Sequence, residues 1–117
     1  MINAEQAAQY LGWATFPAGW GLIEIMREGQ LSGFVLVKGH EVHAFRLPEY
    51  IGRWGTRKDM QRVLQPLINQ YGLVTTKVMQ ANKNGHRFVQ RIGFKPTGQD
   101  STAVHYTLKR LLHANDA

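Results

Sequence analysis

The apolar residues of this chain follow two different periods, and the change between them limits the possible folds most strongly. Three short runs in the first half, at 22–26, 34–37 and 42–47, are rich in strand-forming residues and end near glycine or proline. From residue 60 to residue 68 the apolar residues instead recur at spacings of three and four, which predicts an amphipathic helix. A β-branched run at 73–79 follows, so the chain contains a strand–helix–strand crossover.

Capping signals mark the ends of two helices in the second half of the chain. Thr56 and Asp59 form a capping box before the central helix, and Gly72 occupies a position at which glycine commonly ends a helix. Asn84 is predicted to cap a second helix, which Gly93 is predicted to end. Both helices therefore have defined limits.

Shorter segments complete the predicted order α, β, β, β, α, β, α, β, β. The sequence predicts a short helix over residues 4–11 before the first strand. After the second helix it predicts a strand starting at 94–96, a turn at 97–101 and a last strand at 103–108. This order is typical of an α+β fold, here an α/β mixed sheet. We expect a twisted sheet with antiparallel and parallel strands and with helices on both faces.

The length of the chain suits one domain. Its 117 residues, 44% of them apolar, can bury a core without disulfide or metal cross-links, and there is no cysteine. We predict a single domain over residues 1–117, in which residues 1–19 are a shortened helix and loop and residues 110–117 are a frayed tail. No apolar run approaches the roughly 18 residues of a membrane span, and the start of the chain does not resemble a signal peptide. We therefore expect no membrane partner and a cytoplasmic protein.

Basic residues concentrate in one part of the chain. The formal net charge is +6, but residues 1–37 carry one arginine against three acidic residues, whereas residues 53–95 carry nine basic residues against Asp59 alone. Such a segment favours a phosphorylated cofactor, a nucleic acid or an acidic protein surface, or it is simply a solvated basic face. Nucleic acid is disfavoured, because no aromatic RNA-binding motif accompanies the polar side of the second helix. That side comprises Lys83, His86, Arg87, Gln90 and Arg91.

Residues 82–94 follow a pattern of an asparagine, two residues, a small residue, a helix and then Gly-Phe. With the element order, this stretch resembles the second conserved block of the GCN5-related N-acetyltransferase (GNAT) superfamily, and the resemblance extends over residues 20–109. It implies the GNAT fold and a cleft between the strands at 42–47 and 73–80 that binds acetyl-CoA. It also implies transfer of the acetyl group to an amine that attacks the thioester directly.

The same resemblance implies which residues hold the coenzyme. Backbone groups of Phe45, Arg46 and Leu47 would hold the pantetheine arm, and Asn82 would flank the cleft. The phosphates would lie at the start of the central helix, because free N–H groups there bind anions. The residues implied for the phosphates are Arg53, Gly55, Thr56, Arg57 and Lys58.

The phosphate loop of the family is incomplete in this chain. Its two small positions fall on Trp54 and Thr56 or, one residue later, on Gly55 and Arg57. Asp59 would also repel a phosphate from the first turn of the helix. The part before the first strand is shorter than is usual in the family, so the acceptor site is either open to a large substrate or degenerate.

Few residues qualify as catalytic groups. The position at which many family members carry a tyrosine that protonates the leaving thiolate is Val89 here. The nearby options for a base are Glu41, His43 and Glu49, of which His43 and Glu49 are the candidates. His43 is suited because imidazole exchanges protons near neutral pH. A single histidine on a strand is also typical of an ordinary half-exposed residue. His40 and His43 point to opposite faces of a strand, so no metal site is predicted.

A second hypothesis is a non-catalytic binding or structural module on the same fold. The incomplete phosphate loop, Val89 and the short amino-terminal part favour it, as does a loose similarity to compact GNAT-like proteins of bacteriophages. Such a module, for example a virion or host-interaction protein, would dock an acidic partner through its basic surface, in the host cytoplasm or the virion. The predicted ligands are therefore acetyl-CoA with an amine acceptor, or an acidic protein partner.

Overall fold

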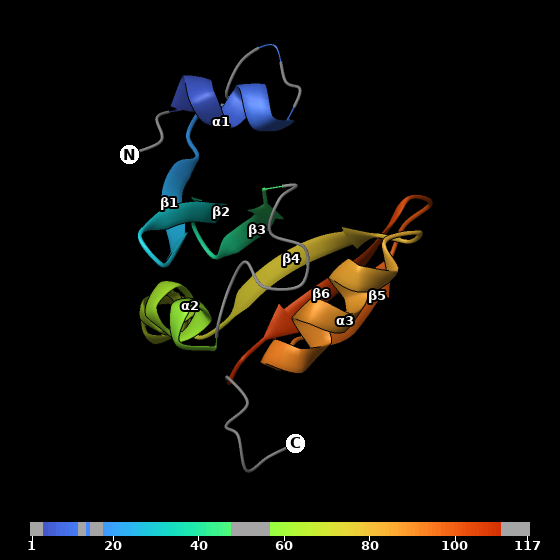
Figure 1. Ribbon diagram of the computed structural model, residues 1–117. Coiled ribbons are helices and arrows are strands. Elements are labelled where there is room, and N and C mark those ends of the chain that lie inside the picture. The colour runs from blue at the N-terminus through green and yellow to red at the C-terminus, as the bar shows by residue number, and fades with distance from the viewer. Residues whose placement is uncertain (1–3, 12–13, 15–17, 48–56, 111–117) are drawn as a thin grey trace. The chain divides into compact units, whose positions relative to one another are not determined.

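The helices and strands occur in the predicted order (Figure 1). A computed structural model describes residues 4–11, 14, 18–47 and 57–110. The predictions that fall on residues 48–56 and 111–117 lie outside this described part. The elements are α1 (Ala4–Leu11), β1 (Gly21–Arg27), β2 (Gln30–Lys38), β3 (Glu41–Arg46), α2 (Arg57–Tyr71), β4 (Val74–Met79), α3 (Lys83–Ile92), β5 (Lys95–Gln99) and β6 (Ala103–Leu108).

Hydrogen bonds join the strands in the order β1-β2-β3-β4-β6-β5. The β3–β4 pair is parallel, whereas β1–β2, β4–β6 and β5–β6 are antiparallel. This confirms the predicted mixed sheet of the α+β class. Contacts divide the chain into two units: one holds α1, β1, β2 and β3 from His43 on, and the other holds Gly39–Val42, α2, β4, α3, β5 and β6. The single domain over residues 1–117 stays a prediction.

The β1–β2 hairpin of the first unit turns through two residues. Glu28 and Gly29 have φ angles of 53° and 80°, and Arg27 pairs with Gln30 on either side of them. Two successive positive φ angles suit the right-handed twist of a hairpin, and the second position is a glycine. Because the turn is this short, β2 starts at Gln30, four residues before the predicted strand at 34–37.

The β1–β2 hairpin contains a bulge at Ser32, whose polar side chain is buried in the first unit. Ile25 pairs with Gly33 and Met26 with Leu31, so Ser32 is the extra residue. The Ser32 hydroxyl donates to the Ile25 carbonyl at 3.0 Å. This bond satisfies a buried polar group that would otherwise destabilise the hairpin. An apolar cluster of the same unit consists of the buried Phe34, Leu36 and Leu47, against which Trp20, Leu22, Leu31 and Phe45 pack.

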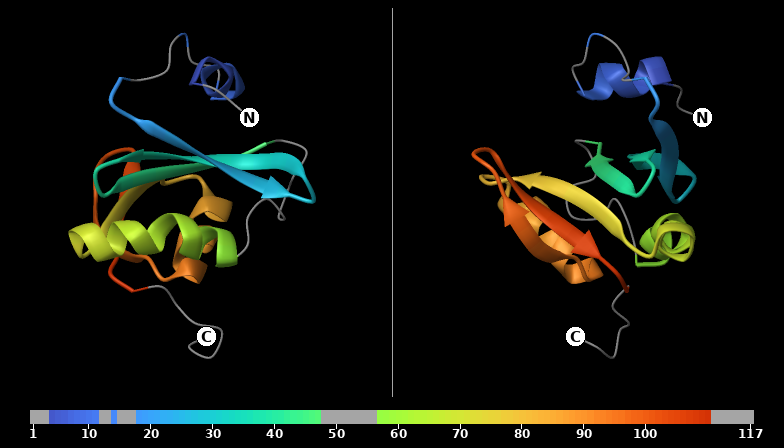
Figure 2. Two further views of the ribbon diagram at one scale, coloured as in Figure 1. Left: turned by 90° about the vertical axis from the view of Figure 1, so that its left-hand side faces the viewer. Right: turned by 180° about the vertical axis from the view of Figure 1, so that it is seen from behind.

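The second unit is built on a three-stranded antiparallel arrangement of β4, β6 and β5. The β4–β6 register runs from Val74 opposite Leu108 to Met79 opposite Ala103. α3 lies against one face of these strands, and the view from behind in Figure 2 shows their other face. The sequence separates these faces, because residues alternate between them along each strand.

The predicted apolar stripe of the central helix α2 and its predicted end are both confirmed. Met60, Val63 and Leu64 are buried. Gly72 has a φ of 80° and donates its N–H to the Ile68 carbonyl at 2.8 Å, so it ends the helix as predicted.

The cap of α3 differs from the prediction. Asn82, not Asn84, is the N-cap, because its backbone is not helical and its side chain accepts the Gly85 N–H at 3.0 Å. Asn84 is already inside the helix. Both asparagines satisfy the local capping rule, so the packing of the next residues decides between them. Gly93 ends the helix as predicted, with a φ of 125°.

The strand β5 extends into the segment predicted as a turn. It runs to Gln99, and a register shift between Pro96 and Gly98 accommodates Thr97 as an extra residue. The missing N–H of Pro96 costs little there, because β5 is the last strand in the sheet order. The turn predicted at 97–101 is therefore displaced and lies between Gln99 and Ala103.

Candidate functional site

The start of α3 is the part of the GNAT-like block that the structure describes in most detail. Besides accepting the Gly85 N–H, Asn82 lies directly against this glycine. A Cβ at Gly85 would stand 2.8 Å from Asn82 Cγ and 2.9 Å from Val78 Cγ1, distances that real Cβ atoms essentially never show. The small residue three positions after the asparagine is therefore required by the contact of the helix with β4.

A hydrogen-bond network fastens the end of β4 to α3 and β6. His86 Nε2 contacts the carbonyl oxygens of Met79 at 3.0 Å and Gln80 at 3.2 Å. Because a carbonyl only accepts, Nε2 carries the hydrogen. In the neutral ring, Nδ1 then accepts the Tyr106 hydroxyl at 2.7 Å, and Gln90 Nε2 donates to the same hydroxyl at 3.4 Å. Both nitrogens of His86 are thus used in holding the fold.

The network changes the expected basic side of α3. His86 is half-buried and Gln90 bonds to Tyr106, so neither belongs to a purely solvated face. Lys83, Arg87 and Arg91 are exposed at successive spacings of four residues. None of these three forms an ion pair with another residue of the described part of the chain.

The parallel contact between the start of β3 and β4 lies within the second unit. Glu41 is opposite Thr75, and the Thr75 N–H donates to the His40 carbonyl at 2.8 Å. The buried Thr76 hydroxyl donates to the Val42 carbonyl at 2.6 Å. A side-chain hydroxyl thus takes part in joining these parallel strands, alongside the backbone.

The residues predicted to hold the pantetheine arm differ in their surroundings. Phe45 packs against Phe34 with ring centroids 5.7 Å apart, and Arg46 is exposed. Leu47 is buried, and its N–H donates to the Ser32 carbonyl at 2.8 Å. That N–H is therefore engaged within the fold and does not serve the predicted role.

The residues predicted to hold the phosphates lie at the start of α2. Arg57 is the first helical residue, and the Lys58 side chain is exposed. Asp59 is in the same turn, as the sequence predicted. Glu49, Arg53, Gly55 and Thr56 lie outside the described residues.

Two of the positions considered for catalysis, His43 and Val89, are at least half-buried. His43 is half-buried, and its ring stands 5.3 Å from the Trp20 ring. Val89, at the position of the family's tyrosine, is buried in α3. It packs as a core residue and offers no proton.

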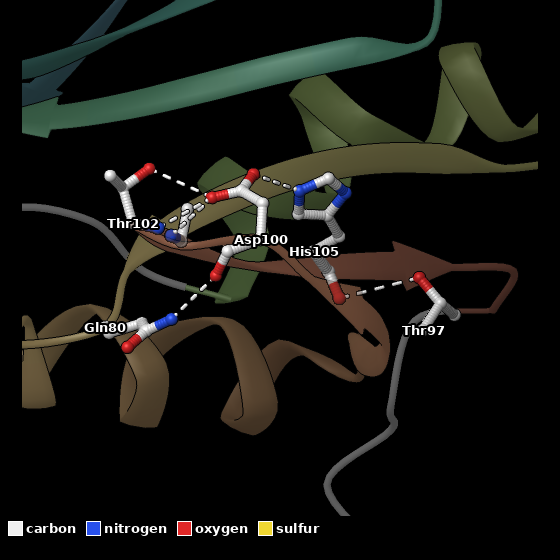
Figure 3. Close-up of polar contacts among 6 residues, drawn as sticks. Gln80, Thr97, Asp100, Thr102 and His105 are labelled. Carbon is white, nitrogen blue, oxygen red and sulfur yellow. Dashed lines mark hydrogen bonds and ion pairs between the residues drawn. The ribbon is translucent and has the colours of Figure 1, made fainter.

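The β5–β6 hairpin contains a histidine–carboxylate pair that was not predicted from the sequence. Asp100 Oδ1 accepts the N–H groups of Thr102 and Ala103 at 2.8 and 2.9 Å and the Thr102 hydroxyl at 2.9 Å. Its Oδ2 contacts His105 Nε2 at 2.7 Å (Figure 3). The Asp-Ser-Thr turn was a visible signal, but the pairing with His105 depends on the hairpin register.

These contacts keep Asp100 ionised. The hydrogen bond from His105, followed by those from the Thr102 and Ala103 backbones, holds the pKa of the Asp100 carboxyl well below its ordinary value. Gln80 ties the turn to the end of β4, because its Nε2 donates to the Asp100 carbonyl at 2.8 Å and its N–H to the Thr102 carbonyl at 2.9 Å.

Comparison with known proteins gives matches in structure only. No protein-family model and no curated protein sequence matches the chain. It is similar to the PaiA N-acetyltransferase from Thermoplasma acidophilum in complex with coenzyme A. The TM-score is 0.66 at 16% identity, and the match covers 79% of this chain and 62% of that one. Nourseothricin acetyltransferase has a TM-score of 0.58 and 19% identity over 72% of this chain and 61% of its own.

A third similar structure is the Campylobacter jejuni N-acetyltransferase PseH in complex with acetyl coenzyme A. Its TM-score is 0.56 at 14% identity, over 80% of this chain and 70% of that one. The chain thus has the fold of these N-acetyltransferases, as its resemblance to the GNAT superfamily implied. It spans less than two thirds of the length of the first two structures. No helix in the described part of the chain is long and apolar enough to cross a membrane.

Proposed function

We propose that this chain is an N-acetyltransferase that binds acetyl-CoA and transfers its acetyl group to an amine. The observation that carries the proposal is the start of α3, where Asn82 caps the helix and Gly85 fits closely between Asn82 and Val78. Asn82 and Gly85 occupy the asparagine and small-residue positions of the GNAT-like block, although Val89 replaces its tyrosine. The chain shares its fold with structures solved with coenzyme A or acetyl coenzyme A.

The described residues fit the coenzyme in two respects. Lys58 is exposed in the first turn of α2, where a cation and the helix N–H groups together favour phosphate. Asn82 stands at the start of α3, where it would flank the coenzyme. Arg57 is proposed beside Lys58, and the backbone of Phe45, Arg46 and Leu47 stays the predicted holder of the pantetheine arm.

Acetyl-CoA supplies an activated thioester, and the protein mainly has to orient it against the amine. Well-oriented reactants gain a large part of the rate from position alone. Val89 cannot protonate the leaving sulfur. Because a thiol ionises with a pKa of about 8.5, the thiolate can leave without a side-chain acid at neutral pH. The absence of the tyrosine is therefore compatible with transfer.

Isothermal titration with acetyl-CoA tests the proposal. Arg57→Glu with Lys58→Glu reverses two charges at the proposed phosphate site. We expect the affinity to fall more than about tenfold, because hydrogen bonds to charged groups contribute roughly 1.5–3 kcal/mol each. The matched control is Lys95→Glu with Lys109→Glu, which makes the same charge change on exposed residues outside the first turn of α2. Equal loss in both variants, or no binding by the wild type, would refute the phosphate site.

A second candidate function is docking of an acidic protein partner through α3. It is favoured by Lys83, Arg87 and Arg91, whose like charges at spacings of four destabilise a helix by a few tenths of a kcal/mol per pair. Binding of a polyglutamate peptide tests it. Affinity should fall steeply with salt and should be lost in Arg87→Glu with Arg91→Glu but not in the Lys95 and Lys109 control. A salt-independent affinity would exclude charge as the cause.

A further inference from the structure

The β5–β6 hairpin carries a chemical group that none of the predicted sites uses. Asp100 is anchored by three donors on Oδ1, so Oδ2 is held in place toward the His105 ring (Figure 3). Both side chains are partly exposed, at 39% for His105 and 46% for Asp100. A fixed carboxylate behind an accessible imidazole is the arrangement that orients a base in many hydrolases and transferases.

The contact determines which nitrogen of His105 is available. The Asp100 carboxylate is ionised near neutral pH and only accepts, so Nε2 of His105 carries the hydrogen. Nδ1 of the neutral ring then keeps its lone pair, and no residue of the described part forms a hydrogen bond with it. His86 is the opposite case, because both of its nitrogens are bonded to the protein.

The surroundings of His105 leave room for a ligand. Its neighbour on β5 is Gly98, and a Cβ built on that glycine meets nothing within 4 Å. Its neighbour on β4 is the exposed Lys77, followed on the same face by Met79, which is 58% exposed. His105 therefore lies between the open space at Gly98 and the basic residue Lys77, on the face of β4 and β6 opposite α3.

The position along β4 connects this face with the proposed coenzyme site. Gln80 bonds the Asp100 turn to the end of β4, and the chain enters α3 at Asn82 two residues later. The histidine–carboxylate pair and the asparagine proposed to flank the coenzyme thus belong to the same end of β4. α3 covers one face there, so an acceptor has the other face by which to approach β4.

We propose that His105 is the base that takes the proton of the acceptor amine, and that Asp100 is its positioning residue. This rests on the proposed acetyl transfer. As the amine nitrogen forms the C–N bond and the C–S bond breaks, the surplus proton moves from nitrogen to His105 Nδ1 and the electron pair of the C–S bond leaves on sulfur. The charge of Lys77 disfavours an ammonium beside it, which helps the amine arrive neutral.

Three variants test the base in steady-state acetylation of a lysine peptide and a peptide with a free amino terminus. His105→Gln should lower kcat/KM by about 10²–10⁴-fold, the usual contribution of a general base, while acetyl-CoA affinity is unchanged. Asp100→Asn presents an amide N–H to Nε2, which forces the hydrogen onto Nδ1, and should cause a similar loss. Thr107→Val is the control, because the hydroxyl that it removes is bonded to Thr97 in the same hairpin and not to Asp100 or His105.

Two further readouts separate a base from a structural role. Millimolar imidazole should restore part of the activity of His105→Ala, which a fold defect would not allow. Diethyl pyrocarbonate should modify His105 faster than His86, and Asp100→Asn should slow the reaction at His105.

The outcomes separate this proposal from the proposed function. Wild-type protein that binds no acetyl-CoA refutes both. Binding and transfer with full activity in His105→Gln refute only the base. If neither peptide is acetylated, reaction of His105 with diethyl pyrocarbonate no faster than that of His86 refutes it.

Discussion

The two faces of the β4–β6 pair carry alternate residues of the same strands, yet they differ in burial and in how their histidines are bonded. On the face toward α3, Val78 and Tyr106 are buried, and both ring nitrogens of His86 form hydrogen bonds within the protein. On the other face Lys77 is exposed, and Nδ1 of His105 forms no hydrogen bond with the described part of the chain. The covering helix, not the residue type, therefore decides whether both ring nitrogens of a histidine are bonded within the fold.

The largest expected effect tests the difference in burial between the faces. Leu108 is 0% exposed and points toward α3, whereas its neighbour Thr107 is on the other face. Leu108→Ala should lower the free energy of unfolding by about 2–5 kcal/mol, because it leaves a cavity. Thr107→Ala should cost about 1 kcal/mol or less. Urea denaturation measures both, and equal losses would contradict the assigned faces.

A smaller effect is expected at the contact of α3 with β4. Gly85→Ala should destabilise by about 1–3 kcal/mol through overpacking against Asn82 and Val78, although alanine favours helices. Gly98→Ala is the matched change on the open side, where space is free, and should stay within about 0.5 kcal/mol. Thermal unfolding distinguishes them. A neutral Gly85→Ala would mean that the start of α3 can move away from β4.

The corrected helix cap gives the next prediction. Asn82→Ala should cost about 0.5–2 kcal/mol, because the Gly85 N–H loses its acceptor. Asn84→Ala lies inside α3 and should be neutral or slightly stabilising, since alanine is the better helix former. Chemical denaturation of the two single variants measures the contrast. The reverse order would restore Asn84 as the cap.

The smallest effect concerns acid stability on the exposed face. The pKa of Asp100 is lowered in the folded chain, mainly by His105. Below about pH 4 the unfolded chain therefore binds a proton that the folded chain does not, and stability is lost as pH falls. Asp100→Asn removes this difference, so its Tm should drop less than that of the wild type between about pH 6 and pH 3. Parallel curves would show that Asp100 is not held in its ionised form.

Much of the architecture was predictable from local patterns. The spacing of Met60, Val63 and Leu64 marked the buried side of α2, and Gly72 and Gly93 marked the ends of the helices, because these features depend on residues within one or two turns. The candidate site was less accessible. Asn82 was found only through the family resemblance, since the local rule favoured Asn84 equally.

Contacts between distant residues could not be predicted in this way. Asp100 contacts His105 across the turn that follows Gln99, in a hairpin whose register includes Thr97 as an extra residue of β5. Likewise, His86 joins Tyr106 because α3 crosses β6 at that point. Neither the hairpin register nor the crossing of α3 over β6 can be predicted from the spacing of these residues in the sequence.

Periodicity, caps and turn glycines were enough to specify the order of helices and strands, because each is a short-range property of the backbone. The tertiary structure alone decided which asparagine caps α3, which histidine is locked and which stays available. Those outcomes depend on strand register and on which face a helix covers, and both are settled by packing between segments far apart in the chain.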